Sequence, residues 1–409
     1  MRATAKSECV EWTHITLGKL SGERGKSVEP AKTPEKKFEL YSVPSFPDRK
    51  PEVVLGKEVG SNKQLVEPRS VLLCKINPRI NRAWVVGDFT AHTKIASTEW
   101  IVFPATDDVE PEFLCYFLQK YAVRDFLAHN ASGVGGSLMR VKPSTLRDFP
   151  FAYPKPKDQR RIVGEIEKQF SRLEEGGGAL KRVQANLKRY RAAVLKAACE
   201  GRLVPASKQW QRRKLGEITS KIGSGSTPRG GEEIYRSTGV PLIRSMNVHS
   251  TGFRFDGLVY IDDAEAKKLD HVIVTAEDVL LNITGASIGR VTTAPASLNG
   301  ARVNQHVCII RPKQELLPSF LAMFLASPNE QARVMNVQVG ATRQALTKAM
   351  VTNWEVPLPS LAEQSRIVAE VERRLSMVEE LEAVVAANLQ RAARLRQSIL
   401  QKAFAGELA

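Results

Sequence analysis

The sequence predicts an α/β (α+β) protein of pseudo-twofold symmetry, in which two globular domains are separated by two long helices that form an antiparallel coiled coil. Two observations predict this class. The segment that starts at Phe149 recurs from Trp354 without a gap, at an offset of 205 residues that aligns Pro154 with Pro359. The segments between the copies also match, more loosely. Two copies of one unit in a single chain are typical of a pseudo-twofold molecule.

The globular segments repeat through short elements. Residues 71–76 match 279–284, and both are short buried strands by composition. Residues 113–118 match 320–325, and both begin amphipathic helices. The predicted domains are residues 1–148, the first globular domain; 149–205, the central helical repeat; 206–353, the second globular domain; and 354–409, the C-terminal helical repeat.

The two repeated segments predict long helices. Apolar residues recur in each at spacings of three, four or seven, as in a helix that packs against another helix. Roughly 40 residues of helix would reach about 60 Å, and one apolar stripe would not make such a helix stable alone, so pairing of the two stripes is expected. The stripes are Ile162, Ile166, Phe170, Leu173, Leu180, Leu187, Tyr190 and Val194, and Ile367, Val371, Leu375, Val378, Val385, Leu389, Leu395 and Ile399.

Glycines lie at the predicted C-terminal ends of both helices and in the middle of the first. Gly201 and its counterpart Gly406 are natural C-terminal stops. Gly176, Gly177 and Gly178 lie midway along the first copy. Three glycines cost about 3 kcal/mol of helix propensity, so we expect a break or kink at this point.

Composition narrows the classes of function. The formal net charge is +16, and residues 149–209 alone carry 14 basic and 6 acidic side chains, a net charge of +8. Such an excess makes nucleic acid the first partner to consider, with a basic but otherwise ordinary protein as the alternative. No apolar run approaches the roughly 20 residues that span a bilayer, and the first residues lack a signal-peptide core. The five cysteines form no Cys-x-x-Cys pair, so a cytoplasmic protein without structural zinc is expected.

The search for catalytic, cofactor-binding and metal-binding residues gives none. Gly25-Lys26-Ser27 resembles the end of a phosphate loop, but Leu20 stands where that loop requires its first glycine. The six histidines are isolated from one another, and no nucleophile has a recognisable base. We therefore expect a binding protein.

Polar residues of the types that contact phosphates and base edges gather in the loops of both globular domains. Arginine suits guanine, asparagine and glutamine suit adenine, and hydroxyls suit phosphates. An ordinary surface role is the alternative for each single residue. The candidate DNA-binding residues are Ser224, Ser226, Thr227, Arg229, Arg244, Asn247, Asn282, Thr284, Arg290, Asn304, Gln305, Thr342 and Arg343 in the second domain, and Tyr41, Ser45, Lys75, Arg79, Arg82, Ser137 and Arg140 in the first.

These motifs resemble the specificity (S) subunit of type I restriction–modification enzymes over essentially the whole chain. The resemblance rests on the two Pro-x-x-x-x-Gln-x-x-Ile motifs that begin at Pro154 and Pro359, on the Gly-x-Leu ends of both repeats, and on the loops at 223–228 and 281–289. The first domain departs from the pattern, because it lacks the Ser-Thr-Pro loop of the second. It resembles another class of target-recognition domain.

The resemblance implies a function. Two target-recognition domains would each read one half of a split double-stranded DNA sequence, and the helices would set the spacer. Two methylation (M) subunits, with S-adenosylmethionine, and restriction/translocase (R) subunits, with ATP and Mg²⁺, would assemble on a chain that is not itself an enzyme. A stand-alone DNA-binding regulator or a nucleic-acid enzyme is the alternative, and co-purification with a methyltransferase distinguishes them.

Overall fold

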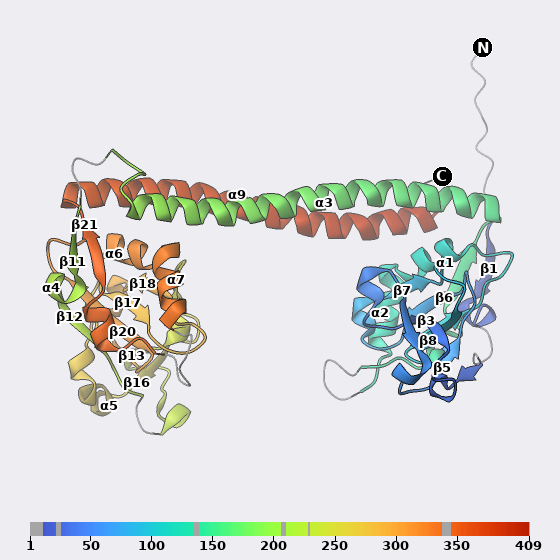
Figure 1. The fold of residues 1–409 in the computed structure, drawn as a ribbon, viewed down its shortest axis with the longest axis horizontal. Helices are drawn as coiled ribbons and strands as arrows, with labels where there is room; N and C mark the ends of the chain where they lie inside the picture. The colour runs from blue at the N-terminus through green and yellow to red at the C-terminus, as the bar shows by residue number, and fades with distance from the viewer. Residues whose placement is uncertain are drawn as a thin grey trace, which may run out of the picture. The chain divides into compact units, whose positions relative to one another are not determined.

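The computed structural model contains two compact units (Figure 1). Unit 1 comprises Met1–Leu180 and Ala387–Ala409, and unit 2 comprises Lys181–Ala386. Each unit therefore includes one globular domain and one half of each long helix. The residues that the structure describes are 11–21, 26–133, 139–205, 210–227, 230–337 and 345–408.

The two repeated segments form the long helices α3, Pro156–Cys199, and α9, Leu361–Phe404, of 44 residues each. The predicted break in the first helix is wrong, because α3 continues through its three glycines. A Cβ atom added at Gly176 or Gly177 would meet nothing within 4 Å, so both glycines lie on an open face. Packing on either side of the glycines holds the helix and outweighs their low propensity.

In unit 1, the first half of α3 packs against the second half of α9. Leu400 and Ala403 of α9 share a buried cluster with Ile162 and Ile166 of α3. Further along, Arg396 lies 3.3 Å from the Glu174 carboxylate. Because residue numbers fall in α9 as they rise in α3, the helices run antiparallel here.

Unit 2 repeats this arrangement with the other halves. Val194 and Ala198 of α3 share a buried cluster with Ile367 and Val371 of α9. Arg191 lies 3.3 Å from Glu379 and 3.6 Å from Glu382. The antiparallel direction is the same as in unit 1, while the supercoiled packing of a coiled coil stays a prediction.

The described residues of the globular part of unit 1 form three sheets and two α-helices. Its largest sheet has the order β2-β5-β8-β3-β4, and all pairs are antiparallel except β3 and β8. A second sheet has the order β7-β6-β9, and β1 pairs with β10. The elements are β1 Thr13–Thr16, β2 Ser27–Val28, β3 Lys37–Tyr41, β4 Glu52–Leu55, β5 Lys63–Leu65, β6 Val71–Cys74, β7 Ala83–Val85, β8 Thr93–Ser97, β9 Trp100–Phe103, α1 Pro111–Leu118, α2 Tyr121–His129 and β10 Pro150–Tyr153.

The globular part of unit 2 is built in a similar way. A four-stranded sheet has the order β12-β20-β17-β18, a three-stranded sheet has the order β16-β13-β19, β11 pairs with β21, and β14 pairs with β15. The elements are β11 Gln211–Lys214, α4 Leu215–Ile218, β12 Thr219–Ser224, β13 Val240–Ile243, β14 Val248–His249, β15 Gly252–Phe253, β16 Val259–Ile261, α5 Asp263–Lys268, β17 Val279–Asn282, β18 Val291–Thr293, β19 Arg302–Val303, β20 Val307–Pro312, α6 Pro318–Leu325, α7 Pro328–Val337, α8 Lys348–Thr352 and β21 Glu355–Leu358.

Each unit contains one parallel strand pair among strands that otherwise pair antiparallel. In unit 1 that pair is β3 and β8, and in unit 2 it is β13 and β19. The predicted buried strands at 71–76 and 279–284 are confirmed as β6 and β17, and the predicted helix starts are confirmed as α1 and α6. The loose repeat in the sequence therefore reflects a repeated topology.

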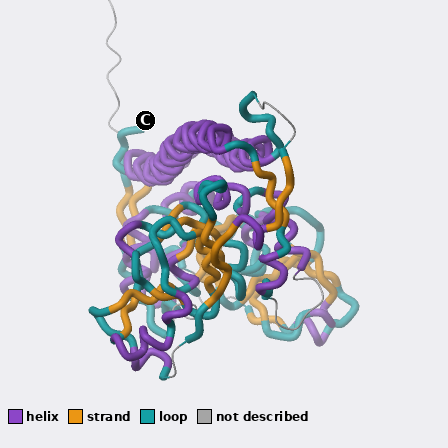
Figure 2. The backbone as a smooth tube through the Cα atoms, turned by 90° about the vertical axis from the view of Figure 1, so that its left-hand side faces the viewer, coloured by secondary structure: helices purple, strands orange, loops and turns teal. Residues whose placement is uncertain are grey.

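In each unit the strands lie to one side of the stretch of α3 and α9 that belongs to it (Figures 1 and 2). Aromatic side chains fill the space between in unit 1, where Phe117 lies 4.7 Å from Phe151 and 5.4 Å from Phe404 between ring centroids. Among the helices of the described residues, none combines the length and the apolar character needed to cross a bilayer.

Candidate nucleic-acid interface

Most of the candidate DNA-binding residues lie at one end of each globular domain, where the parallel strands finish. In unit 1, the Lys75 amide after β6 donates to the Glu99 carbonyl after β8 at 2.9 Å. In unit 2, the Ile283 amide after β17 donates to the His306 carbonyl after β19, also at 2.9 Å. We call these ends the loop edges: residues 41–49, 75–82, 97–99 and 139–141 in unit 1, and 224–227, 243–247, 282–290, 303–306 and 345–346 in unit 2.

Tyr41 and Ser45 at the loop edge of unit 1 are turned to internal contacts. The Tyr41 hydroxyl is fully buried and donates to the Glu39 carboxylate at 2.8 Å. Burial and then this hydrogen bond raise the pKa of Tyr41. The buried Ser45 hydroxyl lies 2.9 Å from the Ser42 hydroxyl, so both residues shape the loop from within.

The basic candidate residues of unit 1 lie in the segment between β6 and β7 and in the segment that precedes β10. Arg79 is exposed between two left-handed residues, Asn77 with a φ of 49° and Asn81 with a φ of 50°. The guanidinium of Arg140 makes two contacts of 3.2 Å with the Glu99 carboxylate. Arg82 donates to the Ile76 carbonyl at 3.5 Å.

Lys75 is half-buried beside these arginines, and no side-chain hydrogen bond or ion pair within the described part of the chain engages Lys75 or Arg79. These two cations are therefore available to phosphate oxygens.

At the loop edge of unit 2, three candidates from separate elements meet. Thr227, after β12, donates to the Oε1 atom of Gln305, after β19. Gln305 Nε2 lies 3.0 Å from His306 Nε2, and His306 Nδ1 contacts the Thr284 hydroxyl, after β17. The sequence alone predicts His306 to be an isolated histidine, with no role in binding. The signal that could have identified it is its place beside Gln305 in the turn before a buried strand.

Gly225 allows the first of these loops to approach so closely. A Cβ atom at Gly225 would lie 1.8 Å from the Val303 carbonyl oxygen, so no other residue fits there without movement of the backbone. The Gly225 amide donates to the Asn304 carbonyl at 3.2 Å. Ser224 is half-buried and Ser226 is exposed on either side of it.

Basic groups lie near this polar cluster. Arg290 is exposed, and its charge, after burial and the charge of Arg254, lowers the pKa of His249 below the ordinary 6.5. Arg244 is engaged internally, because it donates to the Gly257 carbonyl at 2.7 Å and lies 5.1 Å from the Tyr235 ring centroid. Among the described residues of this loop edge, Arg290 is therefore the exposed arginine.

Three asparagines predicted to bind DNA are buried, and their side chains form hydrogen bonds with backbone groups. Asn282 donates to the Ser245 carbonyl at 2.9 Å, and Asn247 donates to the Arg254 carbonyl at 3.0 Å. Asn304 accepts the His306 amide at 3.0 Å. Burial commits these side chains to holding the loops in shape. Arg229, Ser137, Thr342 and Arg343 lie outside the described residues.

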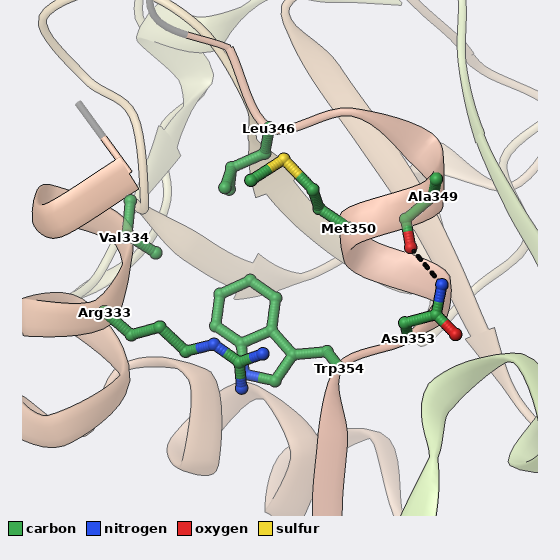
Figure 3. Close-up of a pocket in the computed structure, with 7 residues that line it drawn as sticks. All are labelled: Arg333, Val334, Leu346, Ala349, Met350, Asn353 and Trp354. Carbon is green, nitrogen blue, oxygen red and sulfur yellow. Dashed lines mark hydrogen bonds between the residues drawn. The ribbon is translucent and has the colours of Figure 1, made fainter. Parts of the chain in front are cut away.

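The described residues contain no group of three or more potential metal ligands. A cavity of about 360 Å³ in unit 2 is lined mainly by apolar atoms, between α7, α8 and Trp354 (Figure 3). Its one charged lining residue, Arg333, lies 5.0 Å from the Trp354 ring centroid, and Asn353 Nδ2 donates to the Ala349 carbonyl at 3.0 Å. Such a lining offers no pair of acid and base for catalysis.

Comparison with known proteins agrees with this geometry. Residues 207–382 match the type I restriction modification DNA specificity domain. The chain is 28% identical over 302 residues to the EcoBI specificity subunit of Escherichia coli, a match that covers 69% of this chain and 63% of that protein. It is 22% identical to the EcoKI specificity subunit of Escherichia coli (strain K12), over 72% of this chain and 65% of that protein. The chain thus matches just under two thirds of the length of these relatives.

Solved structures are similar over almost the whole chain. A chain from a study of type I restriction–modification assembly superposes with a TM-score of 0.80 at 22% identity, covering 98% of this chain and 100% of that one. The specificity subunit of Thermoanaerobacter tengcongensis gives 0.58 at 21% identity, covering 97% of both chains. These matches confirm the predicted α+β fold with two domains, and the family model together with the relatives confirms the resemblance.

Proposed function

From the type I restriction modification DNA specificity domain at residues 207–382, we propose that this chain is the sequence-specific DNA-recognition subunit of a type I restriction–modification complex. Each loop edge would read one half of a bipartite site in double-stranded DNA. The observation that carries this proposal is the repetition of one loop edge in both units of a single chain, with different side chains at equivalent places.

The equivalence can be followed residue by residue. The Cys74 amide donates to the Arg82 carbonyl at 2.9 Å, and the Asn282 amide donates to the Arg290 carbonyl at 2.8 Å. Arg82 and Arg290 thus occupy the same place in the two units. Two positioned cations of this kind suit phosphate contacts, which fix the register of a protein on the duplex.

We further propose that α3 and α9 set the spacer between the half-sites and bind two M subunits. Apolar side chains that the helix pair leaves uncovered support this role: Met377 is 54% exposed, Leu381 is 49% exposed and Tyr190 is 45% exposed. Exposed apolar side chains that cluster are typical of an interaction surface. Restriction/translocase (R) subunits would join the resulting complex.

In this proposal the chain is not an enzyme. S-adenosylmethionine, ATP and Mg²⁺ would be bound by the partner subunits, and the complex would act in the cytoplasm. Turnover by the highly purified chain with all three compounds, but without a partner subunit, would contradict this part. A stand-alone regulator or nucleic-acid enzyme is the competing function, and purification without any associated methyltransferase would favour it.

The decisive experiment exchanges one recognition domain. The chain is co-expressed with its M subunits, and the methylated sites are mapped by single-molecule sequencing. Replacing residues 210–353 by the corresponding domain of another specificity subunit should change one half-sequence and keep the other half and the spacer. A variant in which both halves change would contradict independent reading.

A further inference from the structure

We propose that His306 is a positioning residue that holds the Gln305 amide in place, so that unit 2 reads an adenine at one position of its half-site. The inference rests on the proposed function and adds to it a residue and a base. It starts from the polar chain Thr227–Gln305–His306–Thr284, which joins the ends of β12, β19 and β17.

The hydrogen bonds along this chain follow one another from the amide orientation in the structure. Thr227 donates to Gln305 Oε1, and the amide Nε2 can only donate, so it gives a proton to His306 Nε2 at 3.0 Å. His306 Nε2 is then an acceptor, which leaves Nδ1 as the nitrogen that donates. Its proton points to the Thr284 hydroxyl, which His306 Nδ1 contacts.

Thr227 and His306 hold the Gln305 amide at both of its ends. These partners suit either orientation of the amide, because the Thr227 hydroxyl can also accept and the imidazole can carry its proton on Nε2 instead. His306 therefore fixes the plane and the position of an exposed amide that would otherwise turn freely.

Either orientation of the held amide leaves one acceptor and one donor free for DNA. Gln305 is exposed, and its Oε1 keeps one lone pair while its Nε2 keeps one hydrogen. An acceptor beside a donor is the pattern that matches N6 and N7 of adenine in the major groove. A good bidentate pair of this kind discriminates on the order of 5- to 150-fold against the wrong base.

His306 is itself held at both backbone groups. Its amide donates to Asn304 Oδ1 at 3.0 Å, and its carbonyl accepts the Ile283 amide at 2.9 Å. The ring is half-buried, and its two nitrogens bridge Gln305 and Thr284. A rigid ring between two fixed strand ends suits an orienting role better than a flexible side chain would.

Unit 1 carries different side chains at the equivalent backbone positions. Glu99 occupies the place of His306, because its carbonyl accepts the Lys75 amide as that of His306 accepts the Ile283 amide. The Glu99 carboxylate pairs with the Arg140 guanidinium through two contacts of 3.2 Å. The charged pair holds no glutamine, so the adenine-reading arrangement of unit 2 is not repeated by the described residues of unit 1.

The test uses the complete chain assembled with its M subunits and maps methylated sites for four proteins. His306→Phe keeps the ring but removes both nitrogens, and it should relax one position of the unit 2 half-sequence from adenine to any base. His306→Gln restores an acceptor near Nε2 and should recover the preference for adenine. Gln305→Glu offers two acceptors and no donor, and it should shift the same position towards cytosine, whose N4 group donates.

The half-sequence read by unit 1 is the internal control, because it should stay unchanged in every variant that folds and assembles. If His306→Phe relaxes no position while Gln305→Glu changes one, the orienting role is wrong. If neither variant changes the motif, the reading role of Gln305 is also wrong. A wild-type complex without any sequence preference would instead overturn the proposed function, so the two failures can be told apart.

Discussion

Gln159 and Gln364, equivalent residues of the two repeats, make the same three hydrogen bonds at the starts of α3 and α9. Gln159 Nε2 donates to the carbonyls of Asp108 and Pro154, both at 2.7 Å, and its Oε1 accepts the Glu110 amide at 2.8 Å.

Gln364 Nε2 donates to Glu315 and Pro359, both at 2.9 Å, and its Oε1 accepts the Leu317 amide at 2.7 Å. Both side chains are fully buried. Each glutamine thus joins the start of a long helix to the segment that precedes α1 or α6, which explains why this residue type recurs in both copies.

Replacing either glutamine by alanine should lower the free energy of unfolding by about 2–3 kcal/mol, because buried backbone groups lose their partners. Urea denaturation of Gln159→Ala and Gln364→Ala measures this. Gln184→Ala, on the exposed surface of α3, is the matched control and should change stability by less than about 0.5 kcal/mol. Equal losses in all three variants would contradict the structural role.

The glycines inside α3 should be replaceable. Because a Cβ atom at Gly176 or Gly177 meets nothing within 4 Å, alanine at each position should stabilise the protein by up to about 1 kcal/mol. Thermal unfolding measures the gain. Gly201→Ala should act in the opposite direction, because Gly201 has a φ of 69° and the Trp210 ring lies 3.2 Å from the added Cβ. A loss of stability in the first two variants would indicate that α3 needs to bend there.

Arg290 and Arg82 should contribute to DNA affinity through phosphates. Binding should weaken linearly on a log–log plot against salt, and Arg290→Ala or Arg82→Ala should each reduce the slope by about 0.9 for one lost phosphate contact. Lys196→Ala, on the exposed surface of α3, removes the same charge away from the loop edges and is the control. Titrations of the assembled complex at several salt concentrations provide the slopes, and an unchanged slope in both arginine variants would exclude this role.

DNA affinity should depend on pH through the protonation of His249. Burial and the charges of Arg254 and Arg290 lower its pKa below 6.5, so its ring is neutral near pH 7 in the free protein. Phosphates bound at those arginines would offset their charges and raise the pKa of His249. The bound state would then hold more protons than the free state, so affinity should rise a few-fold as the pH falls from about 7 to about 6.

His249→Gln should remove this part of the pH dependence while leaving affinity at pH 8 within about twofold of the wild type, because the ring is uncharged there. Affinity that falls on acidification of the wild type would contradict the sign of the linkage.

Helix length should determine the spacer. Four residues added to each helix, after Gly177 in α3 and at the equivalent place in α9, lengthen each by about 6 Å. With about 3.4 Å per base pair of B-DNA, the methylated motif should gain one or two base pairs of spacer and keep both half-sequences. Methylation mapping detects the change, and a half-sequence that alters with helix length would show that reading and spacing are not separate.

The sequence by itself determined the long-range organisation. A gapless repeat with apolar spacings of three and four predicts two equivalent helices, because helical periodicity is local and survives without knowledge of what the helix contacts. The same holds for β6 and β17, whose continuous apolar runs predicted buried strands. The predicted break at the glycines of α3 was wrong, because intrinsic propensity determines whether a helix continues only where packing on both sides does not.

Tertiary structure alone decided the roles of the polar residues. Asn247, Asn282 and Gln305 belong to residue types that bond to bases and to backbone alike, so their chemistry does not separate a reading side chain from an internal one. Burial committed the two asparagines to backbone groups, while the ends of three strands brought Gln305 together with Thr227 and His306 at an exposed edge. The donors and acceptors that remain free for DNA depend on partners far apart in the chain, and only folding fixes those partners.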